Sequence, residues 1–551
     1  MNNKFKLSLL SAIFSFSINT AYALTQPNNS AAVNNTFVFF ENQIDQEYYI
    51  GPGALDPRFT GANRWIRFGT LNQTSLGYMG STGTWTSNWN ADMWFDTPLN
   101  APPFLGIRCM SSNNNCPASG YLAAEYIDNF GAYKARYVGG GEAGGANRRA
   151  TFNIGMYEYM RDQPVGSISN FIFNTCQTRE EYNPAAGGRC QDATTGNWTR
   201  RPFNVTKLGH VRFVDTRAFS EIWVASDGTP SLAENSEFCR EINLNTGNQN
   251  STVNRGIACR MLEYRTEGAV SSYPNAIRFS MVVDNTTLGY TPAATHLKIN
   301  AGVNPNLAAN WRNYSTAGQL NTLFVDGDGY VSVLFTNEFF IRLLRAGGAV
   351  SGQPGTFTFS ITNTLTGQSG YYQFATGVDV NIIPREYGIS IRPQNREERA
   401  KTGRIGEGEE DIRFDYIVTQ SAPRQADVVQ ASVIGESNVN AGRSYCLFRS
   451  NDNAMSVRIP AYLSYTHSSG NVIEQYSGCD SNATLDMTNA NWSAVPWDQQ
   501  QSGYFYSTNL SLSFPMDDPA SLFSVEGMDW LGSVRAEGDV RVEALWIGVD
   551  R

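Results

Sequence analysis

Short segments in which apolar and polar residues alternate recur along the whole chain of 551 residues. Phe357, Phe359 and Ile361 are separated by threonine and serine, and Leu510 and Leu512 are separated by serine in the same way. A period of two residues is typical of a strand with one face in a core and the other in solvent. The sequence lacks the regular strand and helix alternation that a parallel α/β sheet requires. It therefore predicts a mainly β fold of antiparallel sheets.

Two isolated helices are expected among these strands. The segment Phe152 to Arg161 is closed by Pro164, and the segment Glu338 to Arg345 has Asn337 as its predicted N-cap and Gly347 as its stop.

The final segment, Gly538 to Val549, has the clearest strand pattern. Val540, Val542, Ala544 and Trp546 alternate with charged residues and Leu545. Such a strand either forms the edge of a finished sheet or borders a place where another strand belongs, and the residues leave both alternatives open.

The first 23 residues have the three parts of a secretory signal peptide: Lys4 and Lys6, an apolar run from Leu7 to Ile18, and the small-residue site Ala21 to Ala23. The apolar run is too short to span a bilayer, which needs about 20 apolar residues. Loss of the two lysines changes the formal charge from −9 to −11. An acidic, exported chain without membrane insertion follows, and nucleic acid is an unfavourable partner.

Eight cysteines in an exported chain indicate disulfides. Pairing of neighbours keeps every bridge within one predicted domain: Cys109 with Cys116, Cys176 with Cys190, Cys239 with Cys259, and Cys446 with Cys479. There is no CxxC pair and the three histidines lie far from the cysteines, so neither a metal nor a cofactor is expected.

Mature length favours two to four domains. After the signal peptide at 1–23, we expect an N-terminal β-domain at 24–203, a middle β-domain at 204–385 and a C-terminal domain at 386–551. The cuts lie where the four-cysteine region ends near Pro202 and where a strand ends near Pro384.

No sequence motif supports an enzyme. G-x-S-x-G, H-E-x-x-H and P-loop patterns are absent, and the glycines at Gly139, Gly141 and Gly144 lack the βαβ context of a dinucleotide site. A pair of carboxylates for glycoside hydrolysis leaves no signature in sequence. A secreted carbohydrate-active β-sandwich enzyme therefore stays as the alternative to a binding protein.

Eight stretches, in the same order over essentially the whole chain, resemble the tip adhesins of the common pilus (ECP, also called Mat), a chaperone-usher system. They are GALDPRFTGANRW (Gly53 to Trp65), DMWFDTP (Asp92 to Pro98), CQTREEYNPAAGGRCQDATTGNW (Cys176 to Trp198), SDGTPSL (Ser226 to Leu232), IIPREYGISI (Ile382 to Ile391), FDYIVTQS (Phe414 to Ser421), GRSYCLF (Gly442 to Phe448) and FPMDD (Phe514 to Asp518).

The resemblance implies tandem immunoglobulin-like sandwiches, the last of them pilin-like and lacking one strand. It implies an extracellular protein at a fimbrium tip, exported via the periplasm, that attaches to host cells and supports early biofilm formation. It also implies four partners: a periplasmic chaperone, an outer-membrane usher, a major pilin and a host-cell receptor of glycan or protein nature. A strand donated by a neighbouring subunit would fill the missing place by β-augmentation.

Two expectations follow from this resemblance. Val540, Val542, Ala544 and Trp546 would line the groove that accepts the donated strand. The leader Leu24 to Thr36 contains only two large apolar residues, Leu24 and Val33, and is therefore expected to be a poor donor, which places the subunit at the tip.

Receptor binding is expected in the N-terminal domain, because five of the eleven tryptophans precede residue 200 and exposed aromatic residues beside arginine serve recognition. The candidates are Arg58, Arg64, Trp65, Trp85 and Trp89. The alternative for each tryptophan is a place in the core of a sandwich.

Overall fold

In the computed structural model, contacts between Cα atoms divide the chain into two compact units. Unit 1 comprises Met1–Phe39, Tyr48–Leu208 and Leu365–Tyr371, and unit 2 comprises Phe40–Glu47, Gly209–Thr364 and Tyr372–Arg551. The predicted signal peptide lies outside the described residues. The structure describes residues 24, 27–43, 46–53, 58–63, 76–109, 116–117, 119–137, 147–214, 216, 218–233, 236–244, 252–268, 270, 277–301, 311–314, 326–347, 355–363, 371–394, 400–450, 455–498 and 501–549.

The first part of the chain forms two antiparallel sheets, with the strand orders β9–β10–β6–β12–β13 and β4–β5–β11–β7–β8. Its elements are β1 (Asn28–Asn29), β2 (Val33–Asn42), β3 (Glu47–Pro52), β4 (Phe59–Ala62), β5 (Tyr78–Thr84), β6 (Asn90–Phe95), β7 (Phe104–Arg108), β8 (Tyr121–Ala123), β9 (Tyr126–Ile127), β10 (Gly131–Arg136), β11 (Asn147–Phe152), α1 (Ile154–Asp162), β12 (Ile168–Thr178), η2 (Pro184–Ala186), η3 (Cys190–Asp192) and β13 (Asn197–Val214).

Aromatic side chains fill the space between these two sheets. The ring of Phe104 on β7 lies 4.9 Å from that of Phe95 on β6 and 5.6 Å from that of Phe173 on β12, measured between centroids. Helix α1, predicted from the sequence, adds Met156 and Tyr157 to the same core. The arrangement is a β-sandwich, as the alternating pattern indicates.

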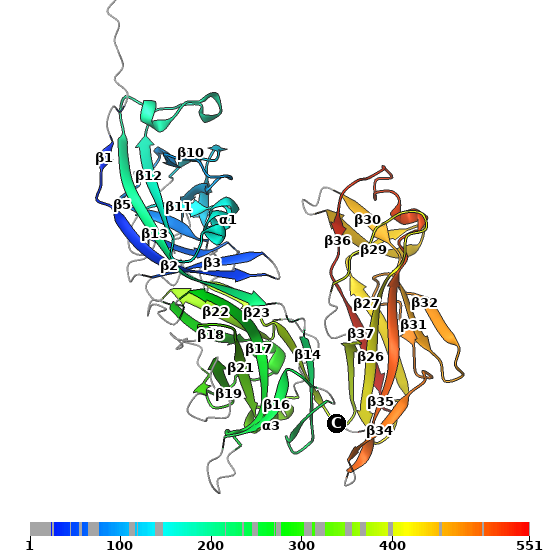
Figure 1. Cartoon of the computed structure of the whole chain (residues 1–551). Helices are drawn as coiled ribbons and strands as arrows, with labels where there is room; N and C mark the ends of the chain where they lie inside the picture. The colour runs from blue at the N-terminus through cyan, green and yellow to red at the C-terminus, as the bar shows by residue number, and fades with distance from the viewer. Residues whose placement is uncertain are drawn as a thin grey trace, which may run out of the picture. The chain divides into compact units, whose positions relative to one another are not determined.

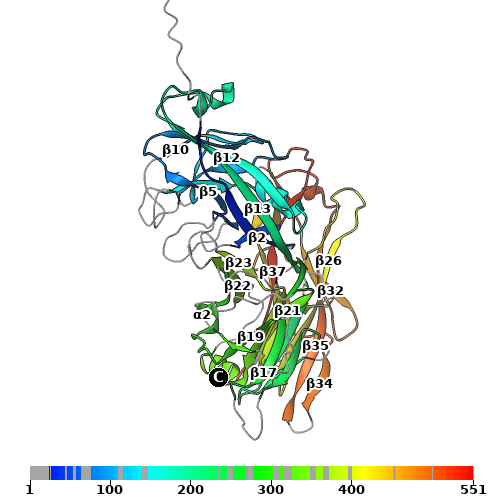
Figure 2. The ribbon, with the colours of Figure 1, turned by 60° about the vertical axis from the view of Figure 1, so that its left-hand side comes forward.

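The middle part of the chain, in unit 2, combines three sheets, with orders β16–β17–β21–β19–β20, β18–β22–β23 and β15–β14–β24. The pair β14 and β24 is parallel, an exception to the antiparallel expectation. Figure 2 shows β17 and β21 side by side. The elements are β14 (Ala218–Val224), β15 (Pro230–Leu232), β16 (Cys239–Asn243), β17 (Arg255–Gly268), β18 (Ile277–Val283), α2 (Asn285–Leu288), β19 (Leu297–Ala301), β20 (Arg312–Asn313), β21 (Gly329–Thr336), α3 (Asn337–Arg345), β22 (Phe357–Asn363), β23 (Tyr372–Ala375) and β24 (Val378–Pro384).

The last part of the chain forms a sandwich of a sheet β25–β26–β35–β31–β32 and a sheet β33–β27–β37. A small sheet β28–β29–β30, with β36 beside β29, extends it (Figure 1). The elements are β25 (Gly388–Pro393), β26 (Ile412–Ala422), β27 (Val428–Gly435), β28 (Ser437–Asn440), β29 (Arg443–Ser450), β30 (Ser456–Ile459), β31 (Tyr462–Thr466), β32 (Val472–Tyr476), β33 (Leu485–Asp486), β34 (Ser493–Asp498), β35 (Gln501–Phe514), η6 (Pro519–Ser521), β36 (Val534–Arg535) and β37 (Gly538–Leu545).

Two details of the sequence interpretation change. The predicted first domain boundary at residue 203 falls inside β13, because this strand runs without interruption from Asn197 to Val214. Helix α3 begins at Asn337, and its N-cap is Thr336, whose hydroxyl oxygen accepts a hydrogen bond from the Phe339 N–H at 3.3 Å. Threonine and asparagine both suit an N-cap, so the sequence leaves a one-residue ambiguity.

The structure contains four disulfides, in the neighbour-to-neighbour pairing that the sequence predicts.

The cap on α3 gives a testable prediction. Replacement Thr336→Val removes the acceptor for Phe339 and the donor to the His296 carbonyl, and we expect a loss of about 1–2 kcal/mol of unfolding free energy. Urea denaturation of the full chain measures it. Thr336→Ser, which keeps the hydroxyl, is the control, and equal stability of the valine and serine variants would contradict this cap.

Candidate functional site

Strand β37 has a ladder partner on one edge only, within the part of the chain that the structure describes. It pairs antiparallel with β27 along its whole length, from Gly538 opposite Gly435 to Leu545 opposite Val428. The other edge of β37 faces β25, which hydrogen-bonds to β26 in the opposite sheet. Within the described residues, these two edges of the sandwich therefore lie next to each other without forming a β-ladder.

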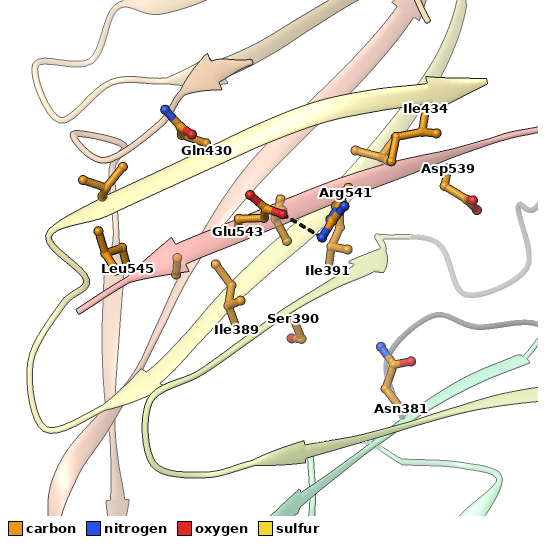
Figure 3. Close-up of a pocket in the computed structure, with 14 residues that line it drawn as sticks. Asn381, Ile389, Ser390, Ile391, Gln430, Ile434, Asp539, Arg541, Glu543 and Leu545 are labelled. Carbon is orange, nitrogen blue, oxygen red and sulfur yellow. Dashed lines mark ion pairs between the residues drawn. The ribbon is translucent and has the colours of Figure 1, made fainter. Parts of the chain in front are cut away.

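A cavity of about 920 Å³ occupies this place. Figure 3 shows that β25, β27 and β37 border it, with Ile389 and Ile391 on one side and the β37 residues on the other. A second cavity, of about 370 Å³, adjoins Val540 and is lined by Phe414, Phe448 and Phe514. We call the two cavities together the β25/β37 groove.

The apolar residues along this groove are only partly covered. Val540, Val542 and Ala544 of β37 are half-buried although they pack on the core. Their neighbours Val429, Ala431 and Val433 on β27 are at most 2% exposed. The core of this sandwich is thus closed around β27 and open along β37.

Val540, Val542 and Ala544, the residues expected at the groove, line the larger cavity. Trp546 lies beyond the end of β37, where its Nε1 donates to the Arg424 carbonyl at 3.1 Å. Ile389 and Ile391 line the same cavity from β25, and nothing local in the sequence assigns them to this edge.

The charged residues of β37 alternate with its apolar residues and also border the larger cavity. Arg541 and Glu543 form an ion pair at 2.7 Å, with side chains 62% and 61% exposed. An exposed pair of this kind contributes little to stability.

The receptor candidates of the N-terminal domain have different surroundings. Arg64 and Trp65 lie outside the described residues. Trp85 is 4% exposed and belongs to the core cluster, so the core alternative holds for this residue and its ring offers no surface to a receptor. Arg58 is half-buried.

Trp89 is the one described tryptophan among these candidates that reaches the surface. Its ring is half-buried, and the Arg179 guanidinium carbon lies 5.4 Å from the ring centroid. Arg179 begins the loop between β12 and β13, so a tryptophan and an arginine distant in sequence form one aromatic and cationic surface.

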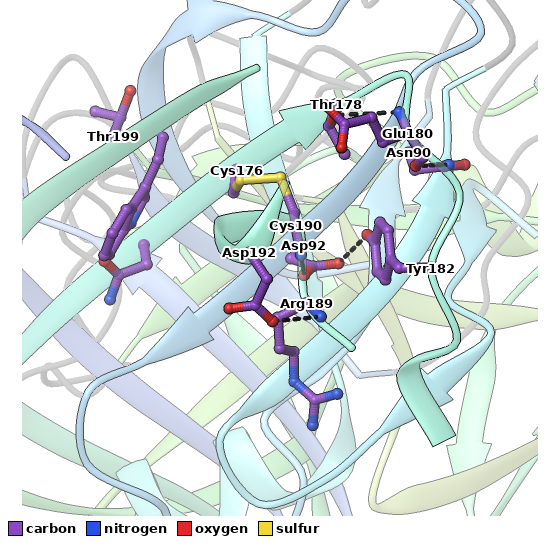
Figure 4. Close-up of a disulfide and its surroundings, with 12 residues drawn as sticks. Asn90, Asp92, Cys176, Thr178, Glu180, Tyr182, Arg189, Cys190, Asp192 and Thr199 are labelled. Carbon is purple, nitrogen blue, oxygen red and sulfur yellow. Dashed lines mark hydrogen bonds between the residues drawn. A yellow bond between two sulfur atoms is a disulfide. The ribbon is translucent and has the colours of Figure 1, made fainter. Parts of the chain in front are cut away.

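The disulfide between Cys176 and Cys190 ties this loop to the sheet (Figure 4). Beneath it lies Asp92, whose carboxylate accepts hydrogen bonds from the Tyr182 hydroxyl and from the backbone N–H groups of Cys190 and Lys134. Burial raises the pKa of the Asp92 carboxyl, and these hydrogen bonds oppose the rise. The buried network fixes the loop in one position.

Glu180 orders the other end of the same loop. Its carboxylate accepts from the backbone N–H groups of Thr194 and Thr195 and from both threonine hydroxyls. These hydrogen bonds lower the pKa of Glu180 to about 2.

Three family models match: the E. coli common pilus adhesin EcpD N-terminal domain over residues 24–211, its middle domain over 215–379, and the EcpD C-terminal domain over 386–544. The fimbria adhesins EcpD of Escherichia coli K12 and of E. coli O157:H7 are each 32% identical over 530 residues, covering 93% of this chain and 93% of each relative. The chain belongs to the EcpD family. It is a fimbrial adhesin.

Among solved structures, a mutant of the CFA/I adhesin CfaE of enterotoxigenic E. coli matches at 10% identity and a TM-score of 0.22, over 60% of this chain and 94% of that chain. Similarity at this level establishes no shared architecture. No helix in the described part of this EcpD-family chain has the length and apolar character to cross a bilayer. The same residues contain no group of three or more potential metal ligands.

The Glu180 contacts predict an acid-sensitive loop in this EcpD-family adhesin. A lowered pKa means that the stabilisation is present above the ordinary glutamate pKa of about 4.5 and is lost as the pH falls towards 2. Glu180→Gln should therefore reduce the hydrogen-exchange protection of the Thr194 and Thr195 amides at pH 6, and much less at pH 2.5.

Hydrogen exchange with intrinsic rates corrected for pH measures this effect. Glu181→Gln is the matched control, because Glu181 pairs with Lys134 and Asn90 rather than with these amides. Equal protection in wild type and Glu180→Gln at pH 6 would contradict the assigned role.

Proposed function

We propose that this adhesin is the tip subunit of a chaperone-usher pilus and that its C-terminal sandwich is completed by a strand from another subunit. The observation that carries the proposal is the β25/β37 groove, where an unpaired strand edge and a row of half-buried apolar residues coincide. An added strand would hydrogen-bond to the free edge of β37 and cover Val540, Val542 and Ala544 with its own side chains.

The N-terminal residues support a tip position. Asn28 and Asn29 form β1, which pairs in parallel with Thr199 and Arg200 of β13, and Leu24 donates its N–H to the Ala193 carbonyl. Val33 begins β2. A segment engaged in its own unit, with few large apolar residues, is a poor strand donor, so this subunit accepts a strand and donates none.

The proposed partners follow from this role. A major pilin subunit supplies the strand after assembly, and a periplasmic chaperone protects the groove before the outer-membrane usher receives the subunit. The adhesin then acts at the extracellular fimbrium tip, where it attaches to a host-cell receptor and supports early biofilm formation. In the N-terminal domain, the Trp89 and Arg179 surface is the proposed receptor contact, with Arg58, Arg64 and Trp65 as further candidates. The role is one of binding, not catalysis.

A peptide that copies the N-terminal extension of the major pilin tests the groove. At a peptide concentration of about 100 times Kd, binding to the folded state adds about 2.7 kcal/mol and should raise the melting temperature of the mature chain by roughly 5–10 °C. Val542→Glu places a charge on the groove wall and should abolish the rise.

Val439→Glu is the matched control, because Val439 is 68% exposed on β28 and lies outside the groove lining. Ile389→Asn changes the opposite wall of the groove and should also abolish the rise in melting temperature. It replaces Val542→Glu if that variant does not fold. Absence of any peptide effect on the wild type, or the same rise in the groove variants, would reject strand acceptance at this place.

A further inference from the structure

A cavity of about 280 Å³ lies against the middle sheet of unit 2, away from the β25/β37 groove. Three of its lining side chains are cross-strand neighbours: Arg260 on β17 is opposite Ser332 on β21, and Ser332 is opposite Asn300 on β19. Directly paired residues share one face of a sheet. A guanidinium, a hydroxyl and an amide therefore stand in one row.

These groups have unused hydrogen-bonding capacity. Asn300 is 3% exposed, and its Nδ2 has no hydrogen-bond partner among the described residues. Arg260 and Ser332 likewise make no side-chain hydrogen bond within that part of the chain. An unsatisfied buried donor is unfavourable, so a cavity ligand that accepts a hydrogen bond from it gains free energy of binding.

An aromatic ring borders the same row. Tyr330, two residues before Ser332 on β21, is 37% exposed and lines the cavity. The Arg260 guanidinium carbon lies 4.5 Å from the centroid of its ring. The disulfide between Cys239 and Cys259 joins the adjacent strands β16 and β17 and holds this wall in place.

The charges around the cavity balance. Arg240 and Arg260 are opposed by Glu237 and Asp328, all four of which line it. Equal numbers of cations and anions disfavour a strongly charged ligand, whereas their many donors and acceptors suit a molecule rich in hydroxyl groups. The volume lies just below the range of about 300–1,000 Å³ found for small-molecule sites, which limits the ligand to roughly one sugar ring.

We propose that this cavity binds one neutral pyranose residue of a glycan. Arg260, Ser332 and Asn300 hydrogen-bond the sugar hydroxyls, and the Tyr330 ring contacts the apolar face of the sugar. The inference rests on the adhesin role of the family and deepens it by adding a site in the middle domain. It does not depend on strand acceptance by the β25/β37 groove.

The methyl pyranosides of glucose, galactose and mannose, together with the acidic methyl glucuronide, are titrated into the full mature chain and followed by saturation-transfer NMR and calorimetry. We expect at least one neutral pyranoside to bind. Arg260→Ala and Asn300→Ala should each weaken its affinity about tenfold, because each removes one hydrogen bond to the bound sugar.

Arg265→Ala is the matched control, because Arg265 is an exposed arginine of the same strand that does not line the cavity. Asn300 is buried, so Asn300→Ala could impair folding. In that case Arg260→Lys is measured in its place, because Arg260 is exposed. Three results would overturn the site: no pyranoside binds, only the glucuronide binds, or the cavity variants bind as the wild type does. Peptide stabilisation of the groove is measured on the same variants, so failure of one proposal is distinguishable from failure of the other.

Discussion

The one-sided hydrogen bonding of β37 is the constraint on which the C-terminal sandwich depends. A strand edge with free N–H and C=O groups is a template for another chain, and proteins commonly protect such edges with charge. Here the outward-facing Arg541 and Glu543 supply charge, while the inward-facing valines remain half-covered. Full burial of a valine side chain is worth about 1.5–3 kcal/mol, so each half-covered residue leaves part of that free energy available to an incoming strand.

Local pattern was sufficient to predict the mainly β class, several of the strands and two of the helices. The alternation of Val540, Val542 and Ala544 predicts β37, and the helix start and stop signals predict α1 and α3. The pattern does not show which strands become neighbours. Strands β25 and β37 belong to different sheets and come together only when these sheets pack, which no residue near either segment indicates. The parallel pairing of β14 with β24 is nonlocal in the same way.

Candidate binding residues were harder to predict than strands, for a related reason. The residues around a tryptophan do not show whether its side chain faces the core or solvent. Trp85 and Trp89, both in the connection between β5 and β6, differ in this respect although they lie four residues apart. The row of Arg260, Ser332 and Asn300 comes from three strands, so its members meet only after the sheet has formed. No local pattern indicates this cavity, since each residue alone is an ordinary polar residue of a strand.

Strand exchange would be unfavourable at β1 and favourable at β37, and this difference gives the proposed pilus a direction. At the N-terminus, β1 satisfies its hydrogen bonds on β13, and removing it for donation would break contacts within unit 1. At the C-terminus, addition of a strand to β37 breaks no ladder in the described structure and covers apolar surface. Growth by strand exchange is therefore favourable at the C-terminal sandwich and unfavourable at the N-terminal unit. On the proposed mechanism, a subunit with this asymmetry ends a fibre.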